Sequence, residues 1–262
     1  MAGQAQQPAT FHWPEYLIEA ACLGLFMVSA GAVTTLLEWH GSLLHDLLPN
    51  ADLRRALIGG AMGLTAIALI HSPWGRRSGA HMNPAVTLAF LSLGRIARRD
   101  AVAYILMQVA GGWLGLMLAR VLLGSALASP EVHWVATVPG PSGALDAWVA
   151  ECAMAFLLLL VVLEAAARPA TAPHTGAIAG ALVALYITVE APVSGMSINP
   201  ARTLASAIPA HEWSTLWIYF TAPVAGALVA ALVHARLGAG RGCAKLDHSG
   251  PERCIHCGWQ AS

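Results

Sequence analysis

Two copies of the triplet Asn-Pro-Ala are the residues of this sequence best suited to chemistry: Asn83-Pro84-Ala85 and Asn199-Pro200-Ala201. Asn is a favoured helix N-cap and Pro fits the first helical turn, so each triplet predicts the start of a helix. The apolar runs at 83–93 and 199–208 are each about ten residues long, or roughly 15 Å of helix. Each run therefore covers half of a hydrocarbon core that is about 30 Å thick.

Two such half-helices, entering from opposite sides, would bring their N-termini together at the midplane of a membrane. Each N-terminus carries about +0.5 of an elementary charge, and capping can hold the amides of Asn83 and Asn199 with their NH2 groups toward the space between them. A water or hydroxyl passing there must offer its oxygen to these donors, which interrupts a proton wire. Arg202 follows the second triplet and adds a fixed guanidinium that repels cations.

The composition places these motifs in a membrane protein. Of the 262 residues, 57% are apolar and 11% are charged, whereas soluble domains are about 45–50% apolar and about 25% charged. The formal net charge of zero argues against a nucleic-acid partner, because such partners attract basic proteins. We find no nucleophile–base pair or metalloprotease pattern, so no enzyme and no cofactor are expected. Six long apolar stretches predict spanning helices: 16–37, 53–71, 101–123, 148–167, 175–189 and 213–236.

The stretches form an internal repeat. Three spans and one half-helix occur in residues 16–123 and again in residues 146–237, with Glu19 and Glu151 near the two starts. Because three spans is an odd number, the two halves must be inverted in the membrane, and paired interrupted segments point to a transport site. The sequence therefore predicts an all-α membrane protein with six transmembrane helices plus two half-helices in an inverted 3+3 repeat.

The basic residues predict the orientation of this fold. Six spans leave both termini on one side, and most Arg and Lys residues fall on that side: Arg76, Arg77, Arg95, Arg98, Arg99, Arg168, Arg236, Arg241, Lys245 and Arg253. The opposite side holds Arg54, Arg55 and Arg120. The positive-inside rule then places both termini in the cytoplasm.

At these motifs the sequence resembles the aquaporin family, the major intrinsic proteins. The motifs are the stretches 78–87 (SGAHMNPAVT) and 197–202 (SINPAR), and the likeness covers residues 15–237. It implies an aquaporin-like channel domain over 16–237, between an N-terminal cytoplasmic segment (1–15) and a cytoplasmic tail (238–262). Residues 1–15 contain no Lys or Arg, which predicts no cleaved leader. A homotetramer in membrane lipid, with one pore per subunit, is also implied.

The resemblance assigns a constriction to Arg202, Met196, Ile187 and a residue of the second span. That residue is Met62 if the loop 72–79 holds one extra residue, and Gly63 if it does not. Such an apolar ring, with one cation-repelling group, departs from the water-specific pattern, where His stands at the Ile187 position. It is similar to the plant nodulin-like subfamily and its bacterial relatives. The implied permeants are water and small neutral solutes such as glycerol, boric acid or arsenite, across a bacterial plasma membrane.

Several roles stay open at this stage. Glu19 and Glu151 could bind a transported ion, or could brace the backbone of the half-helix loops, because non-helical backbone in a membrane must be satisfied from within. His81 could sense pH or pack beneath its loop. A secondary active transporter also has inverted repeats, although we find no paired acidic residues midway along a span. A junction-forming membrane protein with a closed pore is the third possibility.

The tail carries a second set of reactive side chains. Cys243, His248, Cys254 and Cys257 fall within residues 238–262, and Cys254-Ile-His-Cys257 resembles half of a zinc knuckle, in which two thiolates hold one metal. These four residues are the expected metal ligands. The alternative is a flexible cytoplasmic tail with reduced thiols.

Overall fold

The computed structural model describes residues 11–238 and 242–260 and contains helices but no strand within these ranges. The expected segment 1–15 and tail 238–262 lie partly outside the described residues. The helices are α1 (Trp13–Glu38), α2 (Leu43–Leu47), α3 (Ala51–His71), α4 (Pro73–Ser78), α5 (Pro84–Ser92), α6 (Arg98–Leu123), α7 (Ala144–Ala167), α8 (Thr175–Ser194), α9 (Pro200–Ala210) and α10 (Leu216–Arg236).

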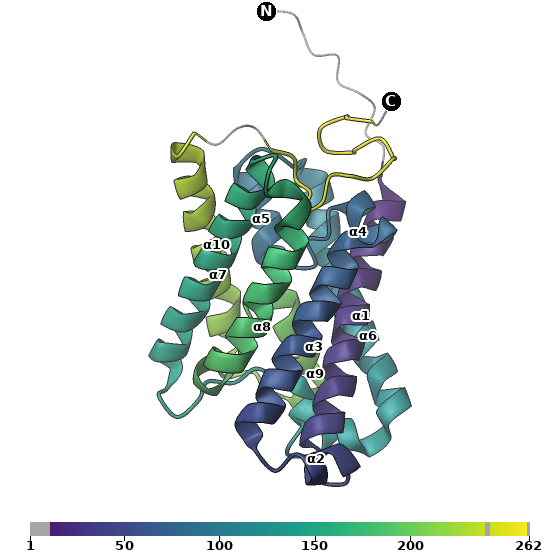
Figure 1. Cartoon of the computed structure of the whole chain (residues 1–262), viewed down its shortest axis with the longest axis vertical. Coiled ribbons are helices and arrows are strands. Elements are labelled where there is room, and N and C mark those ends of the chain that lie inside the picture. The colour runs from purple at the N-terminus through teal and green to yellow at the C-terminus, as the bar shows by residue number, and fades with distance from the viewer. Residues whose placement is uncertain (1–10, 239–241, 261–262) are drawn as a thin grey trace, which may run out of the picture.

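Within the described residues, six helices are long and apolar enough to cross a membrane: α1, α3, α6, α7, α8 and α10. They stand side by side in a bundle, and α1 begins at the same end at which α10 finishes (Figure 1). We call this end the terminal side and the other end the opposite side. The six predicted spans and the all-α fold class are confirmed. Large apolar side chains such as Leu64 and Val121 face outward, 67% and 80% exposed, as expected of a lipid-facing surface.

The predicted end of the fifth span, at residue 189, is wrong. Helix α8 continues to Ser194 with Pro192 inside its last turn. Pro192 has no N–H to donate to the carbonyl of Thr188 four residues earlier. That carbonyl instead accepts a 2.8 Å hydrogen bond from Nε of Arg55 on α3. The side chain of a neighbouring helix therefore replaces the missing backbone donor and lets the helix continue.

The two short helices α5 and α9 begin where the Asn-Pro-Ala triplets predict. Oδ1 of Asn83 accepts from the backbone N–H of Ala85 at 2.9 Å, and Oδ1 of Asn199 accepts from those of Ala201 and Arg202 at 3.1 and 3.2 Å. Each asparagine is in extended conformation, outside the helix that it caps. Local capping chemistry thus explains both starts.

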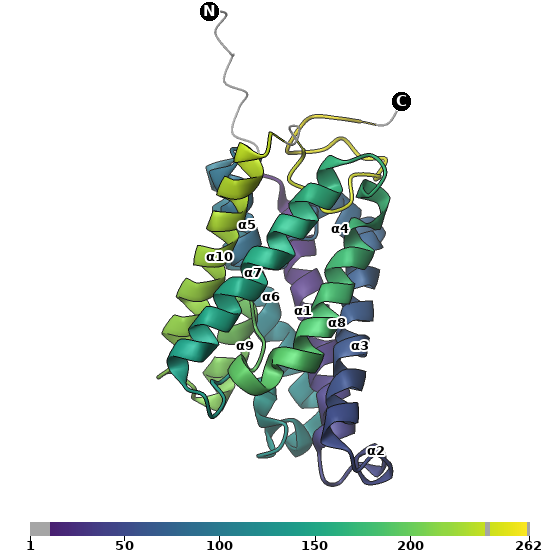
Figure 2. The ribbon, with the colours of Figure 1, turned by 60° about the vertical axis from the view of Figure 1, so that its left-hand side comes forward.

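The helix contacts follow the predicted internal repeat. The most extensive contacts are those of α1 with α6, α7 with α10, and α3 with α8. The first two pairs are equivalent, because each joins the first and third spans of one half. The third pair joins the second span of one half to the second span of the other. Each half-helix also packs on the last long helix of the other half, α5 on α10 and α9 on α6. Figures 1 and 2 show α5 toward the terminal side and α9 toward the opposite side, so the half-helices enter from opposite ends.

Glycines allow the closest of these approaches. A Cβ atom on Gly111 of α6 would lie 2.1 Å from the carbonyl oxygen of Ala20 on α1. In the equivalent pair, a Cβ on Gly226 of α10 would lie 2.1 Å from the carbonyl oxygen of Cys152 on α7. Close backbone contact of this kind is the usual way in which small residues hold membrane helices together.

We predict that Gly111→Ala destabilises the protein by about 1–3 kcal/mol, because the added methyl group overpacks the α1–α6 contact. The matched control is Gly60→Ala, because a Cβ on Gly60 of α3 would meet no atom within 4 Å. Thermal unfolding of the purified protein in detergent is the measurement. Only Gly111→Ala should lower the unfolding temperature, and equal temperatures for the two variants would contradict the packing account.

Candidate functional site

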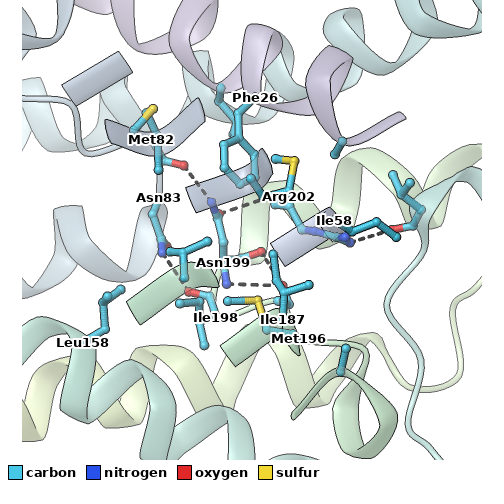
Figure 3. A pocket seen from close by; sticks show the side chains of 18 of the residues that line it. Phe26, Ile58, Met82, Asn83, Leu158, Ile187, Met196, Ile198, Asn199 and Arg202 are labelled. Carbon is cyan, nitrogen blue, oxygen red and sulfur yellow. Dashed lines mark hydrogen bonds between the residues drawn. The ribbon is translucent and has the colours of Figure 1, made fainter. Parts of the chain in front are cut away.

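The two half-helix loops meet and exchange hydrogen bonds through their capping asparagines. Nδ2 of Asn83 donates to the carbonyl of Ile198 at 2.7 Å, and Nδ2 of Asn199 donates to the carbonyl of Met82 at 2.7 Å. The two bonds are equivalent under the internal repeat, and Figure 3 shows the asparagines facing each other. One hydrogen of each NH2 group is thus used between the loops, so only the other can face the cavity. The NH2 groups were predicted to point into the space between the half-helices, and the bonds between the loops were not predicted.

Left-handed residues shape both loops in the same way. Ala80 and Met82 in the first loop, and Met196 and Ile198 in the second, have φ between 47° and 53°. This conformation is uncommon outside glycine and costly for a β-branched residue such as Ile198. It turns the carbonyls of Met82 and Ile198 toward the opposing asparagines. The surrounding contacts must therefore hold this backbone in place.

Two buried carboxylates make those contacts. In the first loop Glu19 accepts hydrogen bonds from the hydroxyl of Ser78 and from the backbone N–H groups of His81 and Met82, at 2.7–3.1 Å. Glu151 accepts the equivalent bonds in the second loop. Glu19 also accepts from the side-chain amide of Gln108 at 2.8 Å. Each carboxylate thus satisfies loop N–H groups that no helix can pair.

In the second loop Glu151 accepts from the hydroxyl of Ser194 and from the backbone N–H groups of Ser197 and Ile198, at 2.5–2.7 Å. Glu151 and Glu19 are both fully buried. Neither carboxylate lines the cavity described below. The geometry therefore favours bracing over binding of a transported ion as the role for these two residues.

His81 connects the first loop to the C-terminal segment. Its Nδ1 lies 3.1 Å from the hydroxyl of Thr87, and its Nε2 lies 2.9 Å from the carbonyl oxygen of Ala244. The ring also stacks on Phe90 at 4.8 Å between centroids. These contacts agree with packing beneath the loop, and they add a link to the tail that the sequence did not predict.

A cavity of about 490 Å³ lies within the bundle beside the two loops. One stripe of α3, at helical spacing, lines it along its length: Ala51, Arg55, Ile58, Met62, Ala66 and Ile70. At 1.5 Å per residue this stripe is roughly 28 Å long, close to the thickness of a hydrocarbon core. Most other lining residues are apolar, including Phe26 and Leu158 (Figure 3). Asn83, Asn199 and Arg202 add hydrogen-bond donors to this wall.

Four of the predicted constriction residues line this cavity: Met62, Ile187, Met196 and Arg202. Nη1 of Arg202 donates to the carbonyl of Val135 at 2.7 Å, in a short turn (His133–Val135) whose residues have φ of 45–56°. That bond fixes the direction of the guanidinium (Figure 3). The role of Val135 could not be predicted from the sequence, because any residue type can offer a backbone carbonyl.

The alternative that placed Gly63 in the constriction does not fit the structure. Gly63 is not among the residues lining the cavity, and a Cβ on it would lie 2.5 Å from the carbonyl oxygen of Gly180 on α8. Gly63 therefore serves the contact between α3 and α8. Met62, which is 2% exposed, lies in the cavity wall instead.

The four predicted metal ligands of the tail are brought together. The ligand atoms of Cys243, His248, Cys254 and Cys257 all lie within 4.8 Å of one another. A hydrogen bond between the sulfurs of Cys243 and Cys254, together with backbone N–H groups of Cys257 and His256, lowers the pKa of Cys254 to about 3. The same hydrogen bond, together with burial, raises the pKa of Cys243 well above its ordinary range.

The structure and sequence of the chain are similar to those of known channel proteins. Its fold matches that of the aquaglyceroporin from Plasmodium falciparum with a TM-score of 0.70, at 20% identity, over 87% of this chain and 97% of that one. Aquaporin NIP1-2 of Arabidopsis thaliana is 36% identical over 176 residues, which is 66% of this chain and 59% of that protein. Aquaporin NIP1-3 of Oryza sativa subsp. japonica is 38% identical over 170 residues, 64% of this chain and 57% of that protein.

These two plant relatives agree with the predicted likeness to the nodulin-like subfamily, although the matched part is less than two thirds of their length. Because they are plant proteins, they lend no support to the expected bacterial membrane. The model of the family described as "Major intrinsic protein" matches residues 11–234. The chain therefore belongs to the major intrinsic protein family.

Proposed function

We propose that this protein is a passive transmembrane channel for water and small neutral solutes, such as glycerol and the hydroxides of boron or arsenic, that excludes protons and ions. The observation that carries the proposal is the cavity whose wall runs along α3 from Ala51 to Ile70. An apolar wall does not replace the hydration shell of an ion, whereas a neutral hydroxyl compound loses less on entry. The donors at Asn83, Asn199 and Arg202 supply the few hydrogen bonds that a hydroxyl oxygen needs.

Residues 16–237 would form the channel, in a homotetramer embedded in lipid with one pore per subunit. Both termini would lie in the cytoplasm, because the loops on the terminal side carry more Arg residues than those on the opposite side. The likeness to the NIP aquaporins supports this function. We name the terminal side of the cavity its cytoplasmic mouth from here on.

The proposal is tested by stopped-flow light scattering on proteoliposomes with water, glycerol and boric acid as permeants. We expect flux above that of empty vesicles, with no dependence on a proton or sodium gradient. Flux that needs such a gradient would show a secondary transporter. The absence of flux for every permeant would fit a junction protein with a closed pore, and either result would overturn the proposal.

We predict that Arg202→Ala admits protons or small cations, because the variant removes the fixed positive charge from the cavity wall. Arg168→Ala is the matched control, since the Arg168 side chain is 60% exposed and pairs with Glu164 outside the cavity. A pH-sensitive dye inside proteoliposomes reports the leak after an external pH jump. If Arg202→Ala conducts solute and still excludes protons as well as the control does, the proposed role of this arginine is wrong.

We predict that Ile187→His lowers glycerol flux more than water flux. The imidazole adds polar surface to the wall and narrows the cavity at this point. Glycerol is larger than water and is therefore hindered more. The control is Ile187→Val, which keeps the wall apolar and should leave the ratio of the two fluxes unchanged. Stopped-flow light scattering measures both fluxes on the same vesicles. An equal fractional loss of both in Ile187→His would place the narrowest point elsewhere.

A further inference from the structure

The described part of the C-terminal segment, residues 242–260, lies across the cytoplasmic end of the bundle in both ribbon views (Figures 1 and 2). It contains no helix or strand, yet Ala244, Leu246 and Cys254 are buried. A segment this short has too little apolar area to hold itself together, and small units of this kind usually rely on a metal or a disulfide. Its cysteines are all free thiols.

The four side chains that cluster in this segment match the ligand set of a tetrahedral zinc site. Sγ of Cys243 lies 3.4 Å from Sγ of Cys254, and Nε2 of His248 lies 3.2 Å from Sγ of Cys257. With zinc–sulfur bonds of about 2.3 Å and zinc–nitrogen bonds of about 2.0–2.1 Å, neighbouring ligand atoms in a tetrahedron are separated by roughly 3.5–3.8 Å. For one ion to bind all four atoms, the two close pairs would move apart slightly, and any pair as far apart as 4.8 Å would move closer.

The backbone around the last two cysteines is also arranged for such an ion. The N–H of Gly258 donates to the carbonyl of Cys254 at 2.9 Å, and the N–H of Cys254 donates to the carbonyl of Trp259 at 2.7 Å. Gly258 has φ of 74°, a conformation that favours glycine. This tight turn presents Cys254 and Cys257 on one side, as a pair of thiolates three positions apart must be to share a metal.

The stretch between the first two ligands makes several contacts with the channel. Between Cys243 and His248, the N–H of Leu246 donates to the carbonyl of Gly79 at 3.2 Å. Nζ of Lys245 donates to the carbonyl of Arg76 at 2.9 Å. Gly79 has φ of 105°, and a Cβ on it would lie 2.6 Å from the carbonyl oxygen of Ala244. The loop after α4 thus packs closely against this stretch, and the missing side chain of Gly79 leaves room for it.

Asp247 anchors the stretch through two ion pairs, and Leu246 reaches the cavity. Asp247 pairs with Nδ1 of His71 at 2.8 Å and with Nε of Arg76 at 3.1 Å. The backbone N–H and the hydroxyl of Ser249 also donate to Oδ1 of Asp247, at 3.0 and 2.6 Å. Leu246 lines the cavity itself, together with Ile70 and His81.

We propose that Cys243, His248, Cys254 and Cys257 bind one Zn²⁺ ion, and that the ion closes the 243–248 loop into a cap that holds Leu246 in the cytoplasmic mouth. Binding the metal fixes both ends of this loop and removes much of the conformational freedom that it has when released. Loss of the metal frees the cap and opens the mouth. The capping step rests on the proposed channel function, whereas metal binding does not.

Metal binding is tested on the full-length protein, purified in detergent under reducing conditions. Elemental analysis should find about one zinc per chain. Co²⁺ in its place should give thiolate charge-transfer bands and the visible bands of a tetrahedral site. Cys254→Ser/Cys257→Ser should lose the metal, and His248→Ala should bind it more weakly. Cys152→Ser, which changes a cysteine of α7 far from the tail, is the control. Zinc content in the double variant equal to that of the control, or no zinc in the unchanged protein, would overturn the site.

Capping is tested by stopped-flow flux in proteoliposomes of the full-length protein, with zinc or with a chelator on both faces. We expect the chelator to raise flux several-fold in the unchanged protein and not in Cys254→Ser/Cys257→Ser. Leu246→Ala should raise flux while keeping one zinc per chain. Leu237→Ala, an exposed leucine after α10, should change neither. Zinc binding with no effect of chelation or of Leu246→Ala on flux would overturn the cap. If no variant conducts, the proposed channel function fails, and the zinc content still decides the site.

Discussion

The structure depends on one constraint: backbone N–H and C=O groups inside a hydrocarbon layer must find partners within the protein. The two loops before α5 and α9 lie at the centre of the bundle and are not helical, so their backbone N–H groups have no partners within a helix. Glu19 and Glu151 resolve it by accepting the loop N–H groups. Each carboxylate lies on the first long helix of its half, α1 or α7. The position of that helix therefore sets the geometry of the loop that its carboxylate binds.

This arrangement sets the chemistry of the cavity. The loop N–H groups are directed at the carboxylates, and the carbonyls of Met82 and Ile198 point the other way. There they accept hydrogen bonds from Nδ2 of the capping asparagines. The cavity therefore has few polar groups, and these are fixed before any solute arrives. The two halves share this design, but among the described residues the hydrogen bonds from the tail to the channel go to the first half. His81 meets Ala244, whereas its counterpart Ser197 bonds to Thr203.

Much of this could be predicted from the sequence, because the signals were local. Apolar length gave the spans, and the Asn-Pro-Ala caps gave both half-helix starts. Contacts between distant residues left no local signal. The extension of α8 past Pro192 depends on Arg55, and the direction of Arg202 depends on a carbonyl at Val135. Spacing alone could not choose between Met62 and Gly63, because the choice depends on which face of α3 meets α8. The place of Leu246 in the cavity wall was not predicted, although an apolar residue in a polar tail is a signal of burial.

The most direct test of the central role of the carboxylates is the solute and water permeability of Glu151→Gln in proteoliposomes. Glutamine has nearly the same size, but its NH2 group would face the N–H groups of Ser197 and Ile198, or leave one of them unpaired, at a cost of about 1–3 kcal/mol per buried group. We predict that the variant inserts and folds but loses most of its flux, because the second loop no longer holds Ile198 and Asn199 in place. Permeability equal to that of the unchanged protein would contradict the account.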